Sequence, residues 1–324
     1  MVRSYFARRL GYMVLCLFVV ATMVFFMFRM IPGNPIGALM DPSLDAEAVK
    51  TLEQRFGLNE PLPTQYVLYL KNLVQGDFGT SFFYRKPAIE VLADKVLNTI
   101  ILAVVALVLA YAVGILAGVW MAWRRGSKGE TVLILLSLFF RSAPVFWVGM
   151  LLIMLFSYKL GWFPNGGIRS PGYEASSLWM KYLSLDFLHH LVLPALVYAL
   201  YYVSTPMLLM RNTITEVLNE DFIEMARAKG VSETGIMYRH AARNALLPVV
   251  TSFTISVGLA VGGQVLVEYV FGWPGLGREI VLAAQRYDYP VAQASFIMLA
   301  ATVMVMNLCA DILYGVLDPR ISYQ

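Results

Sequence analysis

Long apolar runs recur along this chain, and shorter polar segments separate them. The first run, residues 10–30, holds about twenty mostly apolar residues, which as a helix are enough to cross the hydrocarbon core of a bilayer. The runs that follow are of similar length, and several contain prolines that interrupt the helical pattern. The predicted spans are residues 10–30, 96–123, 131–158, a fourth that opens at His189 and His190, 246–270 and 290–316. The pattern therefore predicts six transmembrane helices.

Composition agrees with this prediction and excludes other classes of protein. Hydrophobic residues make up 59% of the 324 residues and charged residues 14%, whereas ordinary soluble domains carry roughly 25% charged residues. The net charge of +4 is modest, so the chain lacks the electrostatic footprint of a nucleic-acid-binding protein. We therefore predict an all-α integral membrane protein, embedded in a lipid bilayer and without a nucleic-acid partner.

Basic residues predict the orientation of the spans. Arginines precede the first span, and Arg124, Arg125 and Lys128 crowd between the second and third. Because short loops rich in Lys and Arg stay in the cytoplasm, both termini are predicted to be cytoplasmic. The first apolar run exceeds the core of a signal peptide, about 7–15 residues, so it is predicted to be an uncleaved anchor. The expected organisation is 1–30, N-terminus and first helix; 31–95, an extracytoplasmic insertion; 96–316, a core of five helices; and 317–324, a cytoplasmic tail.

The insertion at residues 31–95 has helical patterns of its own. One helix is predicted at residues 45–56 and another at residues 65–74. Gly57 and Gly76 follow the two patterns, where a glycine readily ends a helix. The insertion is therefore predicted to be a small folded segment outside the membrane.

The most densely charged helical segment lies between apolar runs, at residues 220–250. Residues 221–229 lack Gly and Pro and are predicted to be helical. Gly230 is expected to end this helix with a positive φ angle, and Ser232 or Thr234 is expected to cap a second one. Residues at steps of three and four predict one small face on the first helix: Phe222, Met225, Ala226 and Lys229.

This segment resembles the EAA loop of permease subunits in binding-protein-dependent ABC importers, whose pattern is Glu-Ala-Ala, three residues and then Gly. The matching residues are Glu224, Met225, Ala226, Arg227, Ala228, Lys229 and Gly230, with Met225 in place of the first Ala. The following stretch, with Asn244-Ala245-Leu246-Leu247-Pro248, is similar to the dipeptide, oligopeptide and nickel branch of that family. Further motifs of this branch are Ile31-Pro32-Gly33-Asn34-Pro35, Gly76-Asp77-Phe78-Gly79, Gly272-Trp273-Pro274-Gly275-Leu276-Gly277-Arg278 and Asp318-Pro319-Arg320. The resemblance covers nearly the whole chain.

The resemblance implies the fold and the partners of a type I ABC importer. In such an importer the permease forms half of the membrane pathway in the bacterial inner membrane. Its partners are a second homologous permease, two ATPase subunits that bind ATP and magnesium, and an extracytoplasmic substrate-binding protein. A peptide is the first substrate implied; nickel, opines and glutathione-like compounds are others. The insertion at residues 31–95 is expected either to contact the binding protein or to pack against neighbouring spans.

Within the EAA loop, residues 211–245, the resemblance implies a helix that sits in a cleft on an ATPase subunit and moves with it. The residues to which this ATPase-coupling role is carried over are Glu224, Ala226, Arg227, Ala228, Lys229 and Gly230. The small Ala side chains would allow close approach, and the charged side chains would set the register of the contact more than its affinity. The alternative is a solvated loop whose charges only orient the chain in the membrane.

An arginine inside the third span is the main candidate for the translocation pathway. The span is interrupted at Arg141-Ser142-Ala143-Pro144, and a rise of about 1.5 Å per residue puts Arg141 roughly 15 Å deep, near the middle of the bilayer. A charge at that depth costs ~2.5 kcal/mol or more, so it needs a partner or a water-filled cavity. Arg141 is therefore predicted either to line the pathway or to form an intramembrane ion pair with Asp311 or Glu268.

Known motifs for catalysis and cofactor binding are missing from the sequence. Gly126-Ser127-Lys128-Gly129 lacks the spacing of a phosphate-binding loop, and the adjacent His189 and His190 point about 100° apart on a helix, which makes them poor joint metal ligands. We therefore expect no catalytic, cofactor or metal site in this chain. The competing hypothesis is an ion-coupled secondary transporter, for which Asp311 and Glu268 are the acidic candidates at membrane depth.

Overall fold

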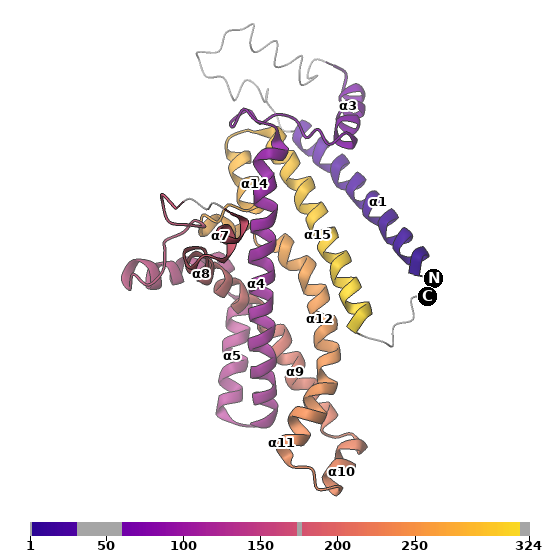
Figure 1. Cartoon of the computed structure of the whole chain (residues 1–324), viewed down its shortest axis with the longest axis vertical. Helices are drawn as coiled ribbons and strands as arrows, with labels where there is room; N and C mark the ends of the chain where they lie inside the picture. The colour runs from indigo at the N-terminus through magenta and orange to yellow at the C-terminus, as the bar shows by residue number, and fades with distance from the viewer. Residues whose placement is uncertain (1, 31–59, 174–176, 318–324) are drawn as a thin grey trace. The chain divides into compact units, whose positions relative to one another are not determined.

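The computed structural model describes residues 2–30, 60–173 and 177–317. Within these residues the chain is helical (Figure 1), and its β-pairing is limited to an isolated bridge between Thr80 and Pro87. The chain forms two compact units. Among the described residues, the first unit combines those up to Thr99 with Pro274–Met304, and the second combines Ile100–Trp273 with residues 305–317. Two long helices, α4 (Ala88–Trp123) and α15 (Tyr289–Leu317), contribute residues to both units.

In the first unit, the first turns of α4 pack with α14 (Leu276–Gln285) and the start of α15. Asp288, which is 1% exposed, lies in the turn between α14 and α15. Its carboxylate accepts hydrogen bonds from the Ser81 hydroxyl and from the backbone N–H groups of Phe82 and Phe83. The buried charge is therefore satisfied, and it fastens the segment before α4 to this turn. The apolar core of the unit comprises Ala88, Leu92, Leu276, Ala283, Val291, Ala292 and Ala294.

The first predicted span and one predicted insertion helix are confirmed as α1 (Val2–Arg29) and α3 (Leu62–Val74). The two helices pack through Phe25, which is 1% exposed and whose ring centroid lies 5.2 Å from that of Tyr66. Gly76 follows α3 with a φ of +77°, as expected for a glycine at a helix end. The predicted helix at residues 45–56 and the terminal Asp318-Pro319-Arg320 motif lie outside the described residues.

The helix of the second predicted span begins earlier than its apolar run. α4 begins at Ala88, so residues 88–95, which we assigned to the insertion, are helical. The added turns are charged, and Lys95 Nζ lies 2.9 Å from Glu279 Oε2 on α14. Hydropathy misses such turns because a helix can continue beyond its apolar run when its polar side chains find partners.

The second unit contains the rest of α4 and the helices that carry the EAA loop. Among the described residues of both units, five helices are long and apolar enough to cross a membrane, or six if the bent pair that begins with α5 is one span. The sequence predicted six spans, so the count agrees when the bent pair is included.

The other helices of the second unit are α5 (Lys128–Ser142), α6 (Val145–Leu152), the π-helix η2 (Ile153–Lys159), α7 (Leu178–Leu183), α8 (Leu185–Tyr202), α9 (Ser204–Val217), α10 (Asp221–Ala228), α11 (Glu233–Gly235), the π-helix η3 (Ile236–Ala241), α12 (Ala242–Gly263) and α13 (Val265–Val270).

The third predicted span is sharply bent. α5 and the helix that follows it meet at an angle of 106°. Pro144 explains the bend, because the residue before a proline avoids helical angles, and Ala143 is extended with φ −67° and ψ 141°. The bend follows Arg141, so it does not change the rise along α5 from which the depth of Arg141 was predicted, and that depth stays a prediction. Arg141 lies in the last turn of α5, directly before the bend.

Glycines bring α9 close to α4. A Cβ on Gly114 would lie 2.7 Å from Pro206 Cγ, and a Cβ on Gly118 would lie 2.6 Å from the backbone oxygen of Met207. Pro206 is tolerated because it occupies the first turn of α9, where its missing N–H costs no intrahelical hydrogen bond. The α4–α9 contact is therefore closer than any side chain larger than hydrogen would allow.

Replacing Gly118 with Ala is expected to lower the melting temperature of the purified chain in detergent. The new methyl group would meet backbone oxygen and Met210 Cβ, and the resulting overpacking costs about 1–3 kcal/mol, which outweighs the ~1 kcal/mol helix preference of Ala over Gly. Gly11→Ala is the matched control, because a Cβ at Gly11 has nothing within 4 Å. Equal melting temperatures for the two variants would contradict the close α4–α9 contact.

Candidate functional site

The EAA loop, residues 211–245, contains the two short helices that the sequence predicted. α10 covers Asp221–Ala228, and α11 begins at Glu233. Ser232 caps α11, since its hydroxyl oxygen accepts a hydrogen bond from the Gly235 N–H at 3.3 Å. Figure 1 shows α10 and α11 together at one end of the second unit. The chain then continues through η3 into α12, so the loop is connected directly to a membrane span.

Gly230 ends α10 with a φ of +78°, as predicted. The Gly230 N–H donates to the Arg227 oxygen at 2.9 Å, and the Val231 N–H donates to the Ala226 oxygen at 3.2 Å. These two bonds form a Schellman motif, which satisfies carbonyl groups at the helix end and sets the direction in which the chain leaves. A Cβ on Gly230 would have nothing within 4 Å. Glycine is therefore favoured here by its backbone conformation and not by lack of space.

The loop has a small apolar core of its own. Ile223 and Ile236 are completely buried, and Ala226 is 7% exposed. The side chains that pack around them are Val217, Leu218 and Val231. Of the small face predicted for this helix, Ala226 lies in this core, whereas Phe222 and Met225 are 41% and 57% exposed. On so short a helix, steps of three and four residues fit two adjacent stripes, and only the packing decides which stripe is buried.

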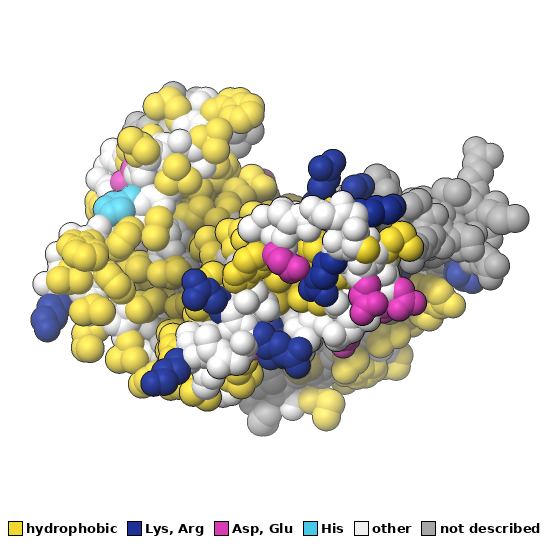
Figure 2. Space-filling view, turned by 90° about the horizontal axis from the view of Figure 1, so that it is seen from below, with side chains coloured by type: hydrophobic (Ala, Val, Ile, Leu, Met, Phe, Trp, Pro, Cys, Tyr) yellow, Lys and Arg dark blue, Asp and Glu magenta, His cyan; other side chains and the backbone are white. Residues whose placement is uncertain are grey.

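The outward surface of α10 combines apolar and charged side chains. Arg227 Nε lies 3.0 Å from Glu233 Oε1 on α11, but both side chains are largely exposed, so this pair contributes little to stability. Seen from this end, Lys and Arg side chains lie beside Asp and Glu side chains, with apolar side chains between them (Figure 2). Of the residues carried over to the coupling role, Ala226 packs inside the loop. The exposed ones are Glu224, Arg227, Ala228, Lys229 and Gly230.

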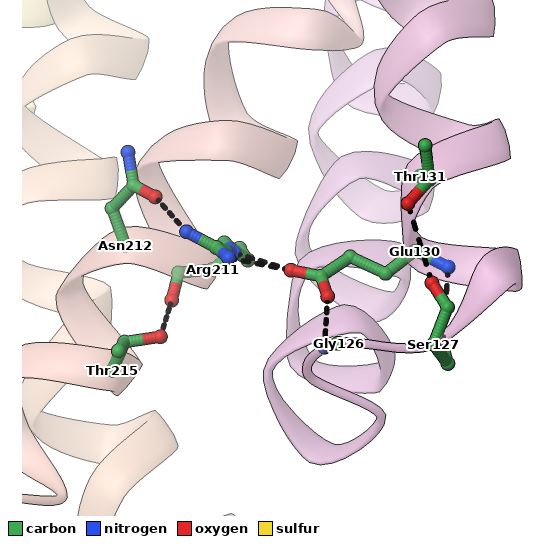
Figure 3. A network of polar contacts seen from close by, with 7 residues as sticks. All are labelled: Gly126, Ser127, Glu130, Thr131, Arg211, Asn212 and Thr215. Carbon is green, nitrogen blue, oxygen red and sulfur yellow. Dashed lines mark hydrogen bonds and ion pairs between the residues drawn. The ribbon is translucent and has the colours of Figure 1, made fainter.

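A buried ion pair fixes the first residue of the EAA loop (Figure 3). Arg211 on α9 donates from Nε at 2.8 Å and from Nη2 at 2.6 Å to Glu130 Oε1 on α5. The Gly126 N–H donates to Glu130 Oε2 at 2.6 Å. Glu130 is 4% exposed, and both of its oxygens have donors, which offsets the cost of burying its charge.

This pair was not predicted from the sequence, although half of it has a recognisable sequence pattern. Ser127 and Glu130 have the Ser-x-x-Glu spacing of a capping box directly before an apolar run. The structure confirms the cap, since the Ser127 hydroxyl oxygen accepts a hydrogen bond from the Glu130 N–H at 3.2 Å. Arg211 lies 81 residues away along the chain, and its position gives no local sign of its partner.

The three charged residues that the sequence assigned to the membrane interior lie in different surroundings. The Arg141 guanidinium lies over the ring of Tyr201, with 4.5 Å between Cζ and the ring centroid. Glu268 is fully buried in α13, and Asp311 is partly buried in α15. Within the described part of the chain, the ion pairs do not join Arg141 to either acid. The partner of Arg141 is therefore aromatic, and its role in the pathway stays a prediction.

The two adjacent histidines make separate contacts. His189 Nε2 lies 2.7 Å from the Trp162 oxygen, and His190 Nδ1 lies 2.8 Å from the Asp186 oxygen. Across the residues that the structure describes, no three side chains of the kinds that bind metals come close enough together to hold an ion.

Comparisons with known proteins match almost the whole chain. Residues 114–323 match the family described as binding-protein-dependent transport system inner membrane component, and residues 1–103 match the N-terminal family of the same transport systems. The chain is 38% identical to the oligopeptide transport system permease protein AppB of Bacillus subtilis, and 39% identical to the di/tripeptide transport system permease protein DppB of Pseudomonas aeruginosa. It is 35% identical to the glutathione transport system permease protein GsiC of Escherichia coli. Each of these matches covers 99% of both chains.

A solved structure supports the fold. The MetNI methionine ABC transporter, in an inward-facing conformation, matches with a TM-score of 0.54 at 19% identity. The match covers 71% of this chain and 97% of that chain.

Ile223→Ala is expected to loosen the EAA loop without unfolding the membrane helices. The change removes a fully buried side chain and costs about 2–5 kcal/mol, so amide hydrogen exchange across α10 and α11 should accelerate about tenfold or more. Phe222→Ala is the matched control, since this neighbouring side chain is 41% exposed. If Phe222→Ala accelerated exchange as much as Ile223→Ala, the assignment of the buried face would be wrong.

Proposed function

The chain belongs to the family of binding-protein-dependent transport system inner membrane components, and from this premise we propose that it forms half of the transmembrane pathway of an ATP-driven importer. It is a multi-pass protein of the bacterial inner membrane and a transport subunit, not an enzyme. A second homologous permease supplies the other half of the pathway. Two ATPase subunits bind ATP and magnesium, and an extracytoplasmic binding protein delivers the substrate.

The observation that carries this proposal is the construction of the EAA loop. Ile223 and Ile236 hold α10 from the inside, while Phe222 and Met225 project outward among charged side chains. Apolar anchors within a charged rim are typical of a surface that docks on another protein. The internal core and the Schellman motif at Gly230 leave α10 little freedom to move by itself. A displacement imposed on α10 by an ATPase subunit is therefore passed to α9 and α12.

This construction suits an alternating-access mechanism. When ATP binds, the two ATPase subunits close and draw the EAA loops of the two permeases together. The helices that carry the loops then separate at the outer side, and the pathway opens toward the binding protein. ATP hydrolysis and release of the products allow the loops to move apart, which returns the pathway to its inward-open state. In this mechanism the membrane helices of the chain line the pathway, and the EAA loop transmits the movement of the ATPase subunit to them.

We propose a peptide or a similar small solute as the substrate. The relatives that we compared are named for oligopeptides, di- and tripeptides and glutathione. All of these compounds carry amide groups and at least one carboxylate. Arg141 is the side chain that we propose to meet such a carboxylate, since it is exposed at the bend after α5 and its guanidinium face lies on Tyr201. A guanidinium stacked in this way can still direct N–H groups from its edge to a carboxylate.

Replacing Gly230 with Pro is expected to abolish the stimulation of ATP hydrolysis by the binding protein in proteoliposomes that contain the complete complex. Proline cannot adopt a φ of +78°, and it removes the N–H that bonds to Arg227. Gly230→Asn is the matched control, because Asn tolerates positive φ and a Cβ there has open space. We expect the Asn variant to keep at least about half of the native stimulation.

The opposite results would support the competing ion-coupled carrier, which family membership does not favour. If Gly230→Pro retained full stimulation in an assembled complex, the EAA loop would not be the coupling element. If uptake followed a proton or sodium gradient and needed no ATPase, the proposed function would be wrong.

Arg141→Met is expected to reduce uptake of a labelled tripeptide about tenfold or more, while binding-protein-stimulated ATP hydrolysis persists. The substitution removes the charge and the N–H groups that would meet the substrate carboxylate. Arg141→Lys retains the charge without the planar fork, so an intermediate rate is expected. Full uptake by a normally inserted and assembled Arg141→Met complex would remove Arg141 from the mechanism.

A further inference from the structure

Glu130 is a buried carboxylate in the first turn of α5, a helix of the bent span. It joins elements that are far apart in the sequence (Figure 3). Its Oε2 accepts from the backbone of Gly126 in the α4–α5 turn, and its Oε1 accepts two hydrogen bonds from Arg211 on α9. The side chain of Arg211 is 25% exposed and that of Glu130 is 6% exposed. One carboxylate therefore ties the α4–α5 turn to the helix that leads into the EAA loop.

Further contacts hold both members of the pair in place. Gly126 has a φ of +80°, and in this turn its N–H meets the carboxylate. Ser127 caps the start of α5 through the Glu130 N–H. On the other side, Arg211 Nη1 donates to Asn212 Oδ1 at 2.9 Å. These contacts leave the two charged groups little freedom to rotate, so the pair joins the two elements rigidly.

Arg211 is connected to the core of the EAA loop by α9 itself. Val217 and Leu218, at the end of α9, pack on the core around Ile223 and Ile236. The helix from Arg211 to Val217 is continuous, and at 1.5 Å per residue it spans roughly 9 Å. A movement of α10 is therefore passed through the core to α9, along α9 to Arg211, and from Arg211 to the α4–α5 turn.

An ion pair fixes the relative position of two helices more specifically than apolar packing does. The close contacts at Gly114 and Gly118 hold α4 and α9 together through van der Waals packing, and the ion pair adds hydrogen bonds between specific donors and acceptors. A shift of about 1.5 Å, the rise of one residue, would break the short hydrogen bonds and leave a buried charge unpaired, which is strongly unfavourable. The ion pair therefore fixes the register of α9 against the α4–α5 turn.

We propose that Glu130 and Arg211 are positioning residues that make the α4–α5 turn move together with the EAA loop when the ATPase subunits close. The inference rests on the proposed function and extends it. The motion of the loop passes directly to α9 and α12. It reaches α4 and α5 through the ion pair, the glycine contacts and the hydrogen bonds of Tyr111 on α4 with Ser252 and Ser256 on α12.

The test uses the complete complex in proteoliposomes, with uptake of a labelled tripeptide and ATP hydrolysis measured in the same sample. Glu130→Ala and Arg211→Ala are each expected to keep stimulated ATP hydrolysis within about twofold of native, while the number of peptides imported per ATP falls about tenfold or more. Lys128→Ala is the matched control, since this exposed charge lies in the same turn. The number of peptides that this variant imports per ATP should equal that of the native complex. If both pair variants imported as many peptides per ATP as the native complex, the proposal would be overturned. A native complex without stimulated hydrolysis would contradict the proposed function and not the pair.

A cross-linking experiment separates a mechanical link from a general contribution to stability. Cys16 and Cys309 are exposed free thiols, so both are first replaced with Ser. Glu130→Cys and Arg211→Cys are then combined and joined with a short thiol-reactive cross-linker. The joined complex is expected to regain a ratio within about threefold of native, whereas the unjoined complex stays uncoupled. A joined complex that remains uncoupled would overturn the proposal. If the Ala variants do not assemble, Glu130→Gln replaces them, and its ratio is expected to fall about threefold.

Discussion

A backbone N–H or C=O group in hydrocarbon has no water to bond, and each must therefore find its partner inside the protein. This constraint explains why the described part of the chain is helical and why its breaks occur at few places. Pro144 interrupts the third span, and Gly230 ends α10. Local bonds compensate at the helix ends, through the Schellman motif at Gly230 and the caps at Ser127 and Ser232. The bend and the loop are thus defined structures, and both carry residues that we connect to transport.

The second unit combines two kinds of contact that act differently. Glycines at positions 114 and 118 let α9 approach α4 closely, which gains dispersion energy over many atoms. The pair of Glu130 and Arg211 is a directional contact, because its hydrogen bonds form only at one relative position of α5 and α9. Dispersion between α4 and α9 opposes separation of the two helices, and the hydrogen bonds of the ion pair oppose movement of α9 along its own axis. Together they make α9 and the α4–α5 turn suitable for transmitting a displacement.

In the EAA loop, the side chains that form the internal core and those of the proposed docking surface lie on different sides of one short helix. Ile223 and Ala226 face the core of the loop, while Phe222 and Met225 face outward. Because the two sets do not overlap, a partner can grip α10 without disturbing the packing that connects it to the membrane helices. The charged side chains around the outward residues orient such a partner more than they strengthen its binding. A partner that binds the outward side of α10 can therefore displace the helix while its internal packing stays intact.

The membrane class, nearly all of the spans, the two helices of the EAA loop and the glycine between them could be predicted from the amino-acid sequence, because these features depend on local composition, periodicity and turn chemistry. The tertiary structure decided which stripe of α10 is buried, since steps of three and four residues fit both stripes and only the contacts of Ile223 with Ile236 select one. It also decided the 106° bend, the aromatic partner of Arg141 and the pairing of Glu130 with Arg211. Pro144 indicated a break but not its angle, and the partners of these charged residues lie far away along the chain. Only the packing of the helices brings them together.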